Sequence, residues 1–125
     1  MLINFSNHPS DRWDKAQLEA ASEYGNIVDE PFPVVPPDAS ERAIRMMANA
    51  SILKLTSIML DQSDGKPSAI HIMGEMTLTY AIVSRLTDHG ITCLASTTKR
   101  DVTFDKDGNK VAAFQFVQFR KYELY

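Results

Sequence analysis

The stretch 69-AIHIMGEMT-77 decides the fold. An apolar run ends at a glycine, two polar residues follow within three positions, and residues 77–89 then carry apolar side chains at helical spacing. This pattern is typical of a buried parallel strand that turns directly into a helix. Such a turn brings backbone N–H groups and the amino end of a helix to the carboxyl edge of a sheet, where α/β proteins bind ligands, often anionic ones.

The same pattern occurs at two other places in the chain. At the amino end the apolar run 2-LINF-5 leads into 6-SNHPS-10, where Pro9 keeps His8 away from helical dihedral angles. Further on, the apolar run 91-ITCLA-95 leads into 96-STTKR-100. We interpret all three runs as parallel strands, so their polar loops are expected to meet at one edge of the sheet.

Capping residues indicate two more helices. Asp14 is expected to begin a helix over residues 15–24, in which Leu18 and Ala21 face the core. Asp38 and Glu41 form a second capping pair, ahead of a long helix with apolar residues at three- to four-residue steps. Between the two helices, residues 27 and 28 start a short strand, and the prolines at 31, 33, 36 and 37 interrupt regular structure.

The carboxyl-terminal part predicts a hairpin. Residues 102–104 and 111–119 flank the turn sequence 105-DKDGNK-110. Phe114 and Phe116 are expected on one face, and Val117 and Phe119 on the other. A strand that is apolar on both faces is either central or covered by a partner subunit, so we expect a homodimer.

The sequence therefore predicts one α/β domain over residues 1–125. Its strands and helices alternate as in a Rossmann-like, doubly wound layer with a mostly parallel sheet, and an antiparallel β-hairpin follows at the carboxyl end. A chain of 125 residues is long enough for one core and too short for two.

Composition narrows the classes of protein. The formal net charge of −3 argues against a protein that coats long nucleic acid, which would carry a basic field. No uninterrupted apolar run approaches the ~20 residues that span a bilayer, and no basic segment precedes the first strand, so neither a membrane anchor nor a signal peptide is expected. The single cysteine fits a reducing compartment. We expect a cytoplasmic protein.

The three polar loops supply the candidate site residues. His8 is a candidate general acid or base, and Lys99 and Arg100 are candidate stabilisers of phosphate charge. The candidate ligand-binding residues are Ser6, Asn7, Ser10, Gly74, Glu75, Thr77, Ser96, Thr97 and Thr98. Serine and threonine also cap helices and turns, so it is the convergence of the three loops that favours a binding site.

Several of these residues have an equally simple structural interpretation. His8 is either catalytic or a turn residue whose hydrogen bonds are satisfied, and His71 is expected to be a core histidine. Glu75 either orients a ligand hydroxyl or favours the first turn of its helix. Trp13 either stacks on a base or packs against the first helix, and packing is the simpler reading.

No motif indicates a cofactor or a metal. The three-glycine dinucleotide fingerprint, the P-loop lysine pattern and the Gly-x-Ser-x-Gly elbow are not found in the sequence. Paired histidines or cysteines at zinc spacing and a calcium loop are not found either.

In the segments 4-NFSNHP-9, 73-MGEMT-77 and 96-STTKR-100 the sequence resembles the small stand-alone, Rossmann-like CRISPR-associated accessory proteins, which are related to CARF domains and ring nucleases. The likeness covers most of the chain as an architecture, and the first two segments carry what is motif-like in it. It implies a twofold dimer that binds a cyclic oligoadenylate across the dimer axis.

The resemblance also implies roles for individual residues. Ser6, Asn7 and His8 match the loop after the first strand that grips the ligand in these proteins. Gly74, Glu75 and Thr77 match the later glycine-containing strand–helix turn. Lys99 and Arg100 lie where a family cation would stabilise phosphate charge, but they align with no defined motif.

Ring nucleases cut their ligand without a metal, and the ligand's own 2′-hydroxyl attacks the adjacent phosphate. The resemblance thus implies degradation of the second messenger of type III CRISPR defence. Two alternatives remain open at this point: a non-catalytic regulator or sink that binds the same ligand, and a structural or interaction subunit whose polar loops are only caps.

Overall fold

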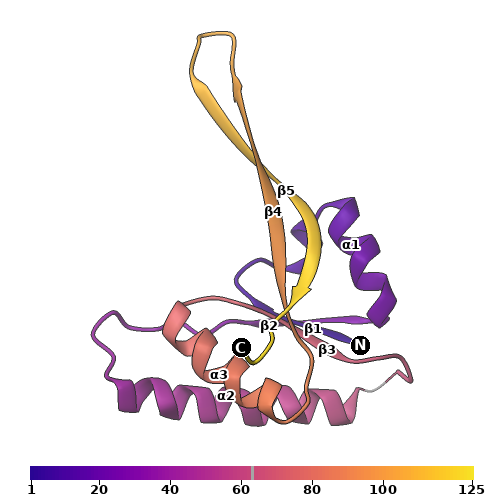
Figure 1. The fold of residues 1–125 in the computed structure, drawn as a ribbon, viewed down its shortest axis with the longest axis vertical. Coiled ribbons are helices and arrows are strands. Elements are labelled where there is room, and N and C mark those ends of the chain that lie inside the picture. Colours follow the sequence, from indigo (N-terminus) through magenta and orange to yellow (C-terminus); the bar gives the residue numbers. More distant parts are fainter. Residues whose placement is uncertain (63) are drawn as a thin grey trace.

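The computed structural model, which describes residues 1–62 and 64–125, contains a mixed five-stranded sheet with the strand order β2-β1-β3-β4-β5 (Figure 1). The parallel strands are β1 (Leu2–Ser6), β2 (Ile27–Pro31), β3 (Ala69–Met73) and the start of β4 (Cys93–Phe104). The last strand, β5 (Lys110–Lys121), is antiparallel to β4. The predicted Rossmann-like α/β fold with a carboxyl-terminal hairpin is confirmed.

Helices cover both faces of the sheet (Figure 1). On one face lies α1 (Lys15–Ala21), which continues into a 3₁₀ turn at Ser22–Tyr24. On the other face α2 (Glu41–Asp61) and α3 (Met76–Asp88) pack against each other. A second 3₁₀ turn, Ser10–Arg12, lies in the loop after β1.

The two central strands are buried because helices shield them from both sides. All five residues of β1 are buried, as are the first four of β3. The larger core cluster lies under α2 and α3 and includes Ile3, Ile70, Leu78 and Ile82. The smaller cluster lies under α1 and is formed by Leu2, Trp13, Ala21, Ala69 and Leu94.

Helix α1 begins where the sequence predicts, but its buried face and the cap of α2 differ from the prediction. Asp14 caps α1 as predicted, since its side chain accepts the N–H of Gln17. The prediction that Leu18 faces the core is wrong: Leu18 is 41% exposed, whereas Gln17 is buried. The cap of α2 is Ser40, whose Oγ accepts the N–H of Ala43, and not Asp38. A helix starts at whichever nearby cap lets its apolar face meet the sheet, and sequence spacing does not distinguish two caps two residues apart.

The largest departure concerns residues 96–100, which were expected to form a loop at the sheet edge. They are part of β4, which runs on without interruption to Phe104 and pairs with β5 along its length. The two strands leave the body of the protein together as a long arm (Figure 1). Polar residues dominate this part of β4 because both of its faces meet solvent, so an exposed strand has the composition of a loop.

A register shift in the hairpin changes one predicted face. Thr97 pairs with Gln118 and Thr98 pairs with Phe116, which leaves Val117 without a partner across the ladder. An unpaired residue of this kind reverses the alternation of side chains beyond it. Phe119 therefore lies on the face of Phe116, with ring centroids 5.0 Å apart, and its prediction on the opposite face is wrong.

In the part of the chain that the structure describes, one helix is long and apolar enough to cross a membrane by length and composition alone. This helix is α2, with 21 residues and a mean hydropathy of 1.2 in its most apolar window. It packs Ala48 and Leu55 into the core beneath the sheet.

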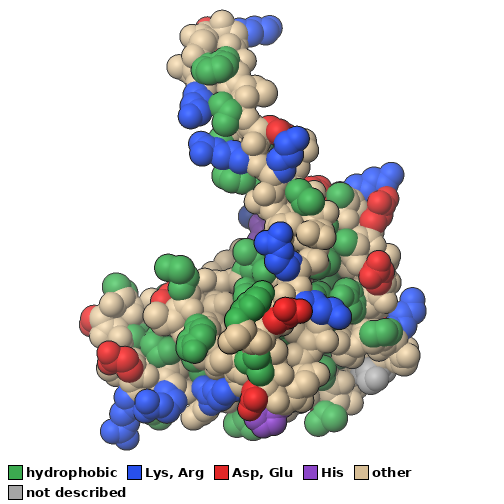
Figure 2. All heavy atoms as spheres, in the orientation of Figure 1, with side chains coloured by type: hydrophobic (Ala, Val, Ile, Leu, Met, Phe, Trp, Pro, Cys, Tyr) green, Lys and Arg blue, Asp and Glu red, His purple; other side chains and the backbone are tan. Residues whose placement is uncertain are grey.

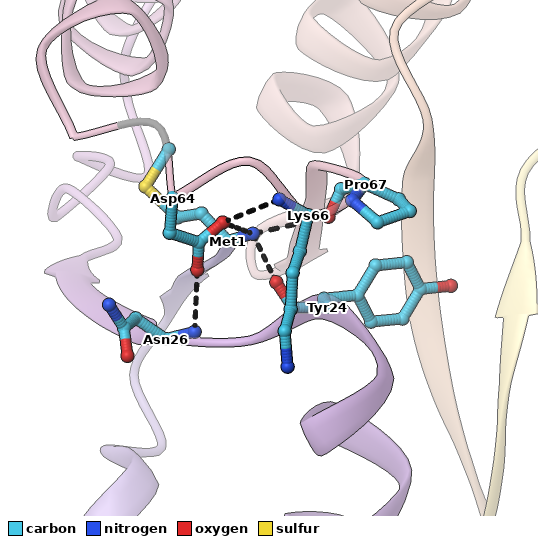
Figure 3. Close-up of polar contacts among 6 residues, drawn as sticks. All are labelled: Met1, Tyr24, Asn26, Asp64, Lys66 and Pro67. Atoms are coloured by element: carbon cyan, nitrogen blue, oxygen red, sulfur yellow. Dashed lines mark hydrogen bonds and ion pairs between the residues drawn. The ribbon is translucent and has the colours of Figure 1, made fainter.

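A cluster of polar contacts joins three separate segments near the start of β1 (Figure 3). The amino nitrogen of Met1 is hydrogen-bonded to the carbonyl oxygen of Tyr24, and it lies 3.1 Å from both the Asp64 carboxylate and the Pro67 carbonyl oxygen. Asp64 also accepts the backbone N–H groups of Asn26 and Lys66. These donors lower the pKa of Asp64 to about 2, the N–H of Asn26 contributing most.

Replacing the Asp64 carboxylate should weaken this cluster of polar contacts and destabilise the fold. Asp64→Asn keeps the size of the side chain but removes the charge that faces the amino group, so we expect a lower urea midpoint at pH 7. The difference from wild type should shrink as the pH falls from about 4 towards 2, because the wild-type carboxylate then becomes protonated as well. Asp61→Asn, at the end of α2, is the matched control and should unfold like wild type at all pH values.

Candidate functional site

A cavity of about 450 Å³ opens at the carboxyl ends of β1 and β3. Its lining residues come from both strands, from the loop after β1, from α1 and from β4, and they are Ser6, Asn7, His8, Gln17, His71, Met73, Gly74 and Ser96. With the strand order β2-β1-β3-β4, the chain reverses its winding direction between β1 and β3. Open α/β sheets bind their ligands in the crevice at such a switch point. The first two predicted loops therefore do converge.

Behind the cavity, a row of polar side chains crosses three strands in register. Asp29 of β2 pairs with Asn4 of β1, and Asn4 pairs with His71 of β3. Asn4 and His71 are 1% and 2% exposed, so their polar atoms need partners within the protein. They find them in each other, since Nδ1 of His71 lies 2.9 Å from Oδ1 of Asn4.

The hydrogen bonds of this row determine which nitrogen of His71 carries the proton. The amide nitrogen of Asn4 donates to the carboxylate of Asp29 at 2.8 Å and to the carbonyl oxygen of His8 at 2.9 Å. Because both partners are acceptors only, the amide orientation of Asn4 is fixed, and its oxygen must face His71. Nδ1 of His71 is therefore the protonated nitrogen, and Nε2 of the neutral ring is an acceptor.

Ser96 is the donor to that acceptor. Its Oγ lies 3.2 Å from Nε2 of His71 and 3.0 Å from the thioether sulfur of Met73. An imidazole nitrogen accepts a hydrogen bond more strongly than a thioether sulfur, so the hydroxyl proton is directed at His71. The half-buried Ser96 thus lines the cavity and is coupled through His71 and Asn4 to Asp29.

Burial keeps His71 neutral. Desolvation is the main cause that lowers the pKa of His71, to about 4, and the positive charge of His8 adds to it. At the other end of the row, burial raises the pKa of Asp29, but the hydrogen bonds from Asn4 and Ser10 outweigh it, and the pKa is lowered overall. The row thus has one fixed negative end and a neutral imidazole at the cavity.

The backbone and the side chain of His8 make separate contributions to the site. Its carbonyl oxygen accepts hydrogen bonds from the Asn4 amide and from the indole N–H of Trp13, at 2.9 and 3.0 Å. Its imidazole is exposed and lines the cavity. Trp13 is buried and its ring packs against His71 and Phe119, which favours the packing interpretation of this tryptophan.

Gly74 is explained by packing as well as by the cavity. A Cβ atom placed on Gly74 would lie 2.5 Å from the ring of Phe32, which is buried in the core. No side chain fits there unless the ring moves. The glycine therefore lets the segment after β2 pass over the end of β3.

Glu75 and Thr77 are engaged in capping α3. The Glu75 carboxylate accepts the N–H groups of Thr77 and Leu78 at 3.1 and 2.8 Å, as well as the Thr77 hydroxyl. These donors, Leu78 first, lower the pKa of Glu75. The amino end of α3, where an anionic ligand was expected, is thus occupied by the protein's own carboxylate, and neither residue lines the cavity.

The remaining predicted residues lie elsewhere. Ser10 donates its hydroxyl to Asp29 at 2.7 Å, and Thr97 exchanges hydrogen bonds with the Gln118 backbone. Thr98, Lys99 and Arg100 lie further out on the arm, whose surface is dotted with basic side chains in Figure 2. Among the described residues that line the cavity there is no lysine or arginine.

The predicted site residues did not include Asn4, Gln17, Asp29, His71 or Met73. Asn4 was predicted as part of the first strand and His71 as a core histidine, and Asp29 was given no role. A polar residue in the middle of a fully apolar strand is the signal that was available for Asn4 and His71. Only the strand register, which the sequence does not show, reveals that they meet.

Burial raises the pKa of the Cys93 thiol to about 11, so it stays protonated at neutral pH. Within residues 1–62 and 64–125, no three His, Cys, Asp or Glu side chains are grouped closely enough to hold a metal ion.

The packing of Gly74 can be tested by substitution. Gly74→Ala should lower the free energy of unfolding by roughly 1–3 kcal/mol, the usual cost of overpacking a core. Urea denaturation followed by circular dichroism measures it. Leu60→Ala, at a position that is 83% exposed, is the control and should change stability little. Wild-type stability in Gly74→Ala would contradict the close approach to Phe32.

The neutral state of His71 predicts a pH dependence of stability. Because the folded protein holds its pKa near 4, below the ordinary value near 6.5, the unfolded chain binds a proton first as the pH falls. Stability from this residue is complete above about pH 6.5 and is lost towards pH 4, by roughly 2–3 kcal/mol.

Urea denaturation at several pH values should show this loss in wild type but not in His71→Gln, measured as the difference between the two proteins. His89→Gln, which alters an exposed histidine at the end of α3, should retain the wild-type slope. Equal slopes for wild type and His71→Gln would show that His71 is not held neutral.

Comparison with known proteins adds a family and no activity. No curated protein and no solved structure matches the chain. A family model described as "Uncharacterized protein MJ1673 family" matches residues 1–120, which is nearly the whole sequence. The protein therefore belongs to the MJ1673 family, whose description assigns no function.

Proposed function

We propose that this protein is a cytoplasmic, ring nuclease-like protein that binds a cyclic oligoadenylate and cleaves it without a metal. One observation carries the proposal: a cavity lies at the switch point of the sheet, and the loop that the resemblance assigns to ligand binding, with Ser6, Asn7 and His8, forms part of its wall. Hydroxyl, amide and imidazole groups suit the ribose hydroxyls and phosphate oxygens of such a ligand.

The polar row offers a route for the proton that the reaction releases. The ligand's 2′-oxygen forms a bond to the adjacent phosphorus, and the bond from phosphorus to the 5′-oxygen breaks. The 2′-hydroxyl proton passes to Ser96 Oγ, while the Ser96 proton moves to Nε2 of His71, 3.2 Å away. His8 donates a proton to the leaving 5′-oxygen. The products are a 2′,3′-cyclic phosphate and a 5′-hydroxyl.

The ring of His71 gains charge in this step, and the row limits the cost. Asn4 accepts from the opposite nitrogen and is itself bound to the Asp29 carboxylate, so a negative charge lies at the far end. The arrangement resembles the way a hydrogen-bonded acceptor orients a histidine base in hydrolases. Lys99 and Arg100 lie on the arm and do not line the cavity of their own chain.

A second candidate function is binding without turnover. The absence of lysine and arginine from the described cavity lining favours it, because cleavage through a charged transition state gains most from nearby cations. In this case the protein is a sink or regulator of the same messenger.

Incubation with labelled cyclic tetra-adenylate in EDTA separates these functions. Linear products support cleavage, and retention on the protein without products supports a sink. If the protein neither retains nor cleaves the ligand, both functions are refuted. Ring size is tested with the tri- and hexa-adenylates.

If the ligand is cleaved, His8→Ala should slow product formation roughly 10²-fold or more while leaving the dissociation constant within a few-fold, as expected for loss of a general acid. Ser96→Ala and His71→Gln should behave alike and should not be additive when combined. His89→Ala is the matched control, since this histidine bonds the Arg85 carbonyl oxygen and is not part of the cavity wall. Normal cleavage by His8→Ala would exclude its role.

A further inference from the structure

The arm carries an apolar stripe that its own chain leaves uncovered. Pairing of Arg100 with Phe114 and of Phe104 with Lys110 puts alternate residues of both strands on one face. On this face Phe104 and Phe114 are 71% and 67% exposed, and Val102 is 42% exposed. Exposed aromatic residues in a row on a protruding hairpin are typical of an interaction surface.

The stripe continues an aromatic stack that begins in the core. Trp13 packs against Phe119, and Phe119 packs against Phe116, with centroid distances of 6.0 and 5.0 Å. Phe116 is half-buried at the base of the arm. Phe116 and Phe119 therefore lie on the same face of the hairpin as the exposed apolar stripe. This face packs against the α1 side of the core at its base and stays apolar further out.

A second uncovered apolar surface lies on the body. A groove of about 660 Å³ runs between α3 and the residues that follow β5. Met76, Tyr80 and Leu124 line it and are 84%, 76% and 59% exposed. The groove shares Met73 and Gly74 with the ligand cavity, so the two hollows are neighbours.

Charge is distributed in opposite senses over these two surfaces. Residues 97–118, the part of the hairpin beyond the cavity-lining Ser96, contain four of the 13 Lys and Arg and three of the 16 Asp and Glu, a net charge of +1, which leaves −4 for the rest of the chain. On the striped face of the arm the charged residues are the cations Arg100 and Lys110. The charged residue of the groove is Glu123.

We propose that the arm of one copy docks in the groove of a second copy, and that the reverse contact closes a twofold dimer. Phe104 and Phe114 cover Met76, Tyr80 and Leu124 of the other chain, and Arg100 and Lys110 lie near its acidic body. Direct stacking of two arms would bring like charges together, so charge complementarity favours arm against body. Figure 1 shows the arm projecting away from its own α3, which requires the contact to form between chains.

The test uses one variant on each surface, and both positions are exposed enough to leave the fold intact. Phe114→Asp alters the arm and Tyr80→Arg alters the groove. Sedimentation equilibrium should give wild type twice the 14.0 kDa mass of the chain, and each variant alone should dimerise roughly 100-fold more weakly. Circular dichroism verifies that both remain folded. Leu53→Asp, on the exposed side of α2, is the control and should dimerise like wild type.

Mixing the two variants distinguishes the arm-to-groove contact from other interfaces. A mixed pair retains one intact contact, formed by the arm of Tyr80→Arg and the groove of Phe114→Asp, so a heterodimer should appear where neither variant pairs with itself. Failure of the mixture to associate would overturn the proposal. A monomeric wild type would overturn it too, whether or not it then binds anionic vesicles, RNA or another protein. None of these outcomes depends on ligand cleavage.

Discussion

The hydrogen bond between Asn4 and His71 is the constraint on which the site depends. It joins the two central strands at a position where both are buried, and each residue would be costly to bury without the other. Its direction is set by Asp29 on the next strand, and it leaves Nε2 of His71 free to accept from Ser96. A fully satisfied row of this kind also fixes the register of β1, β2 and β3, because a slip by one residue would turn every member away from its partner.

The buried strands and helices could be predicted from their apolar periodicity, and the exposed hairpin from its turn sequence, but the continuation of β4 through residues 96–100 could not. The strand around residue 70 and the helix with Leu78, Ile82 and Leu86 have unambiguous apolar periods, because one environment acts along their whole length. In β4 the environment changes at about Ser96, from core to solvent on both faces. The pattern of apolar and polar residues indicates which side chains are buried, but it does not indicate which strands pair. The exposed half of β4 was therefore predicted to be a loop.

The candidate site shows the same limit at the level of single residues. Two of its three predicted loops converge, since parallel strands fix where their ends lie. Sequence spacing does not show which of these side chains are used in other interactions. Glu75 and Thr77 cap α3, and Ser10 is hydrogen-bonded to Asp29. The glycine at position 74 is required by the ring of Phe32. Conversely, Asn4 and His71 gain their importance only from a strand register that lies beyond the local sequence.

The separation of charge links the two proposals physically. A phosphate-bearing ligand would enter a cavity whose described lining lacks lysine and arginine, on a body with a net charge of −4 outside residues 97–118. The cations of the chain that the sequence assigned to this task, Lys99 and Arg100, lie on the arm. Because the groove adjoins the cavity, a docked arm would bring positive charge to the region where the ligand adds negative charge. Ligand binding and dimer formation would then strengthen each other, and by thermodynamic linkage each would do so to the same degree.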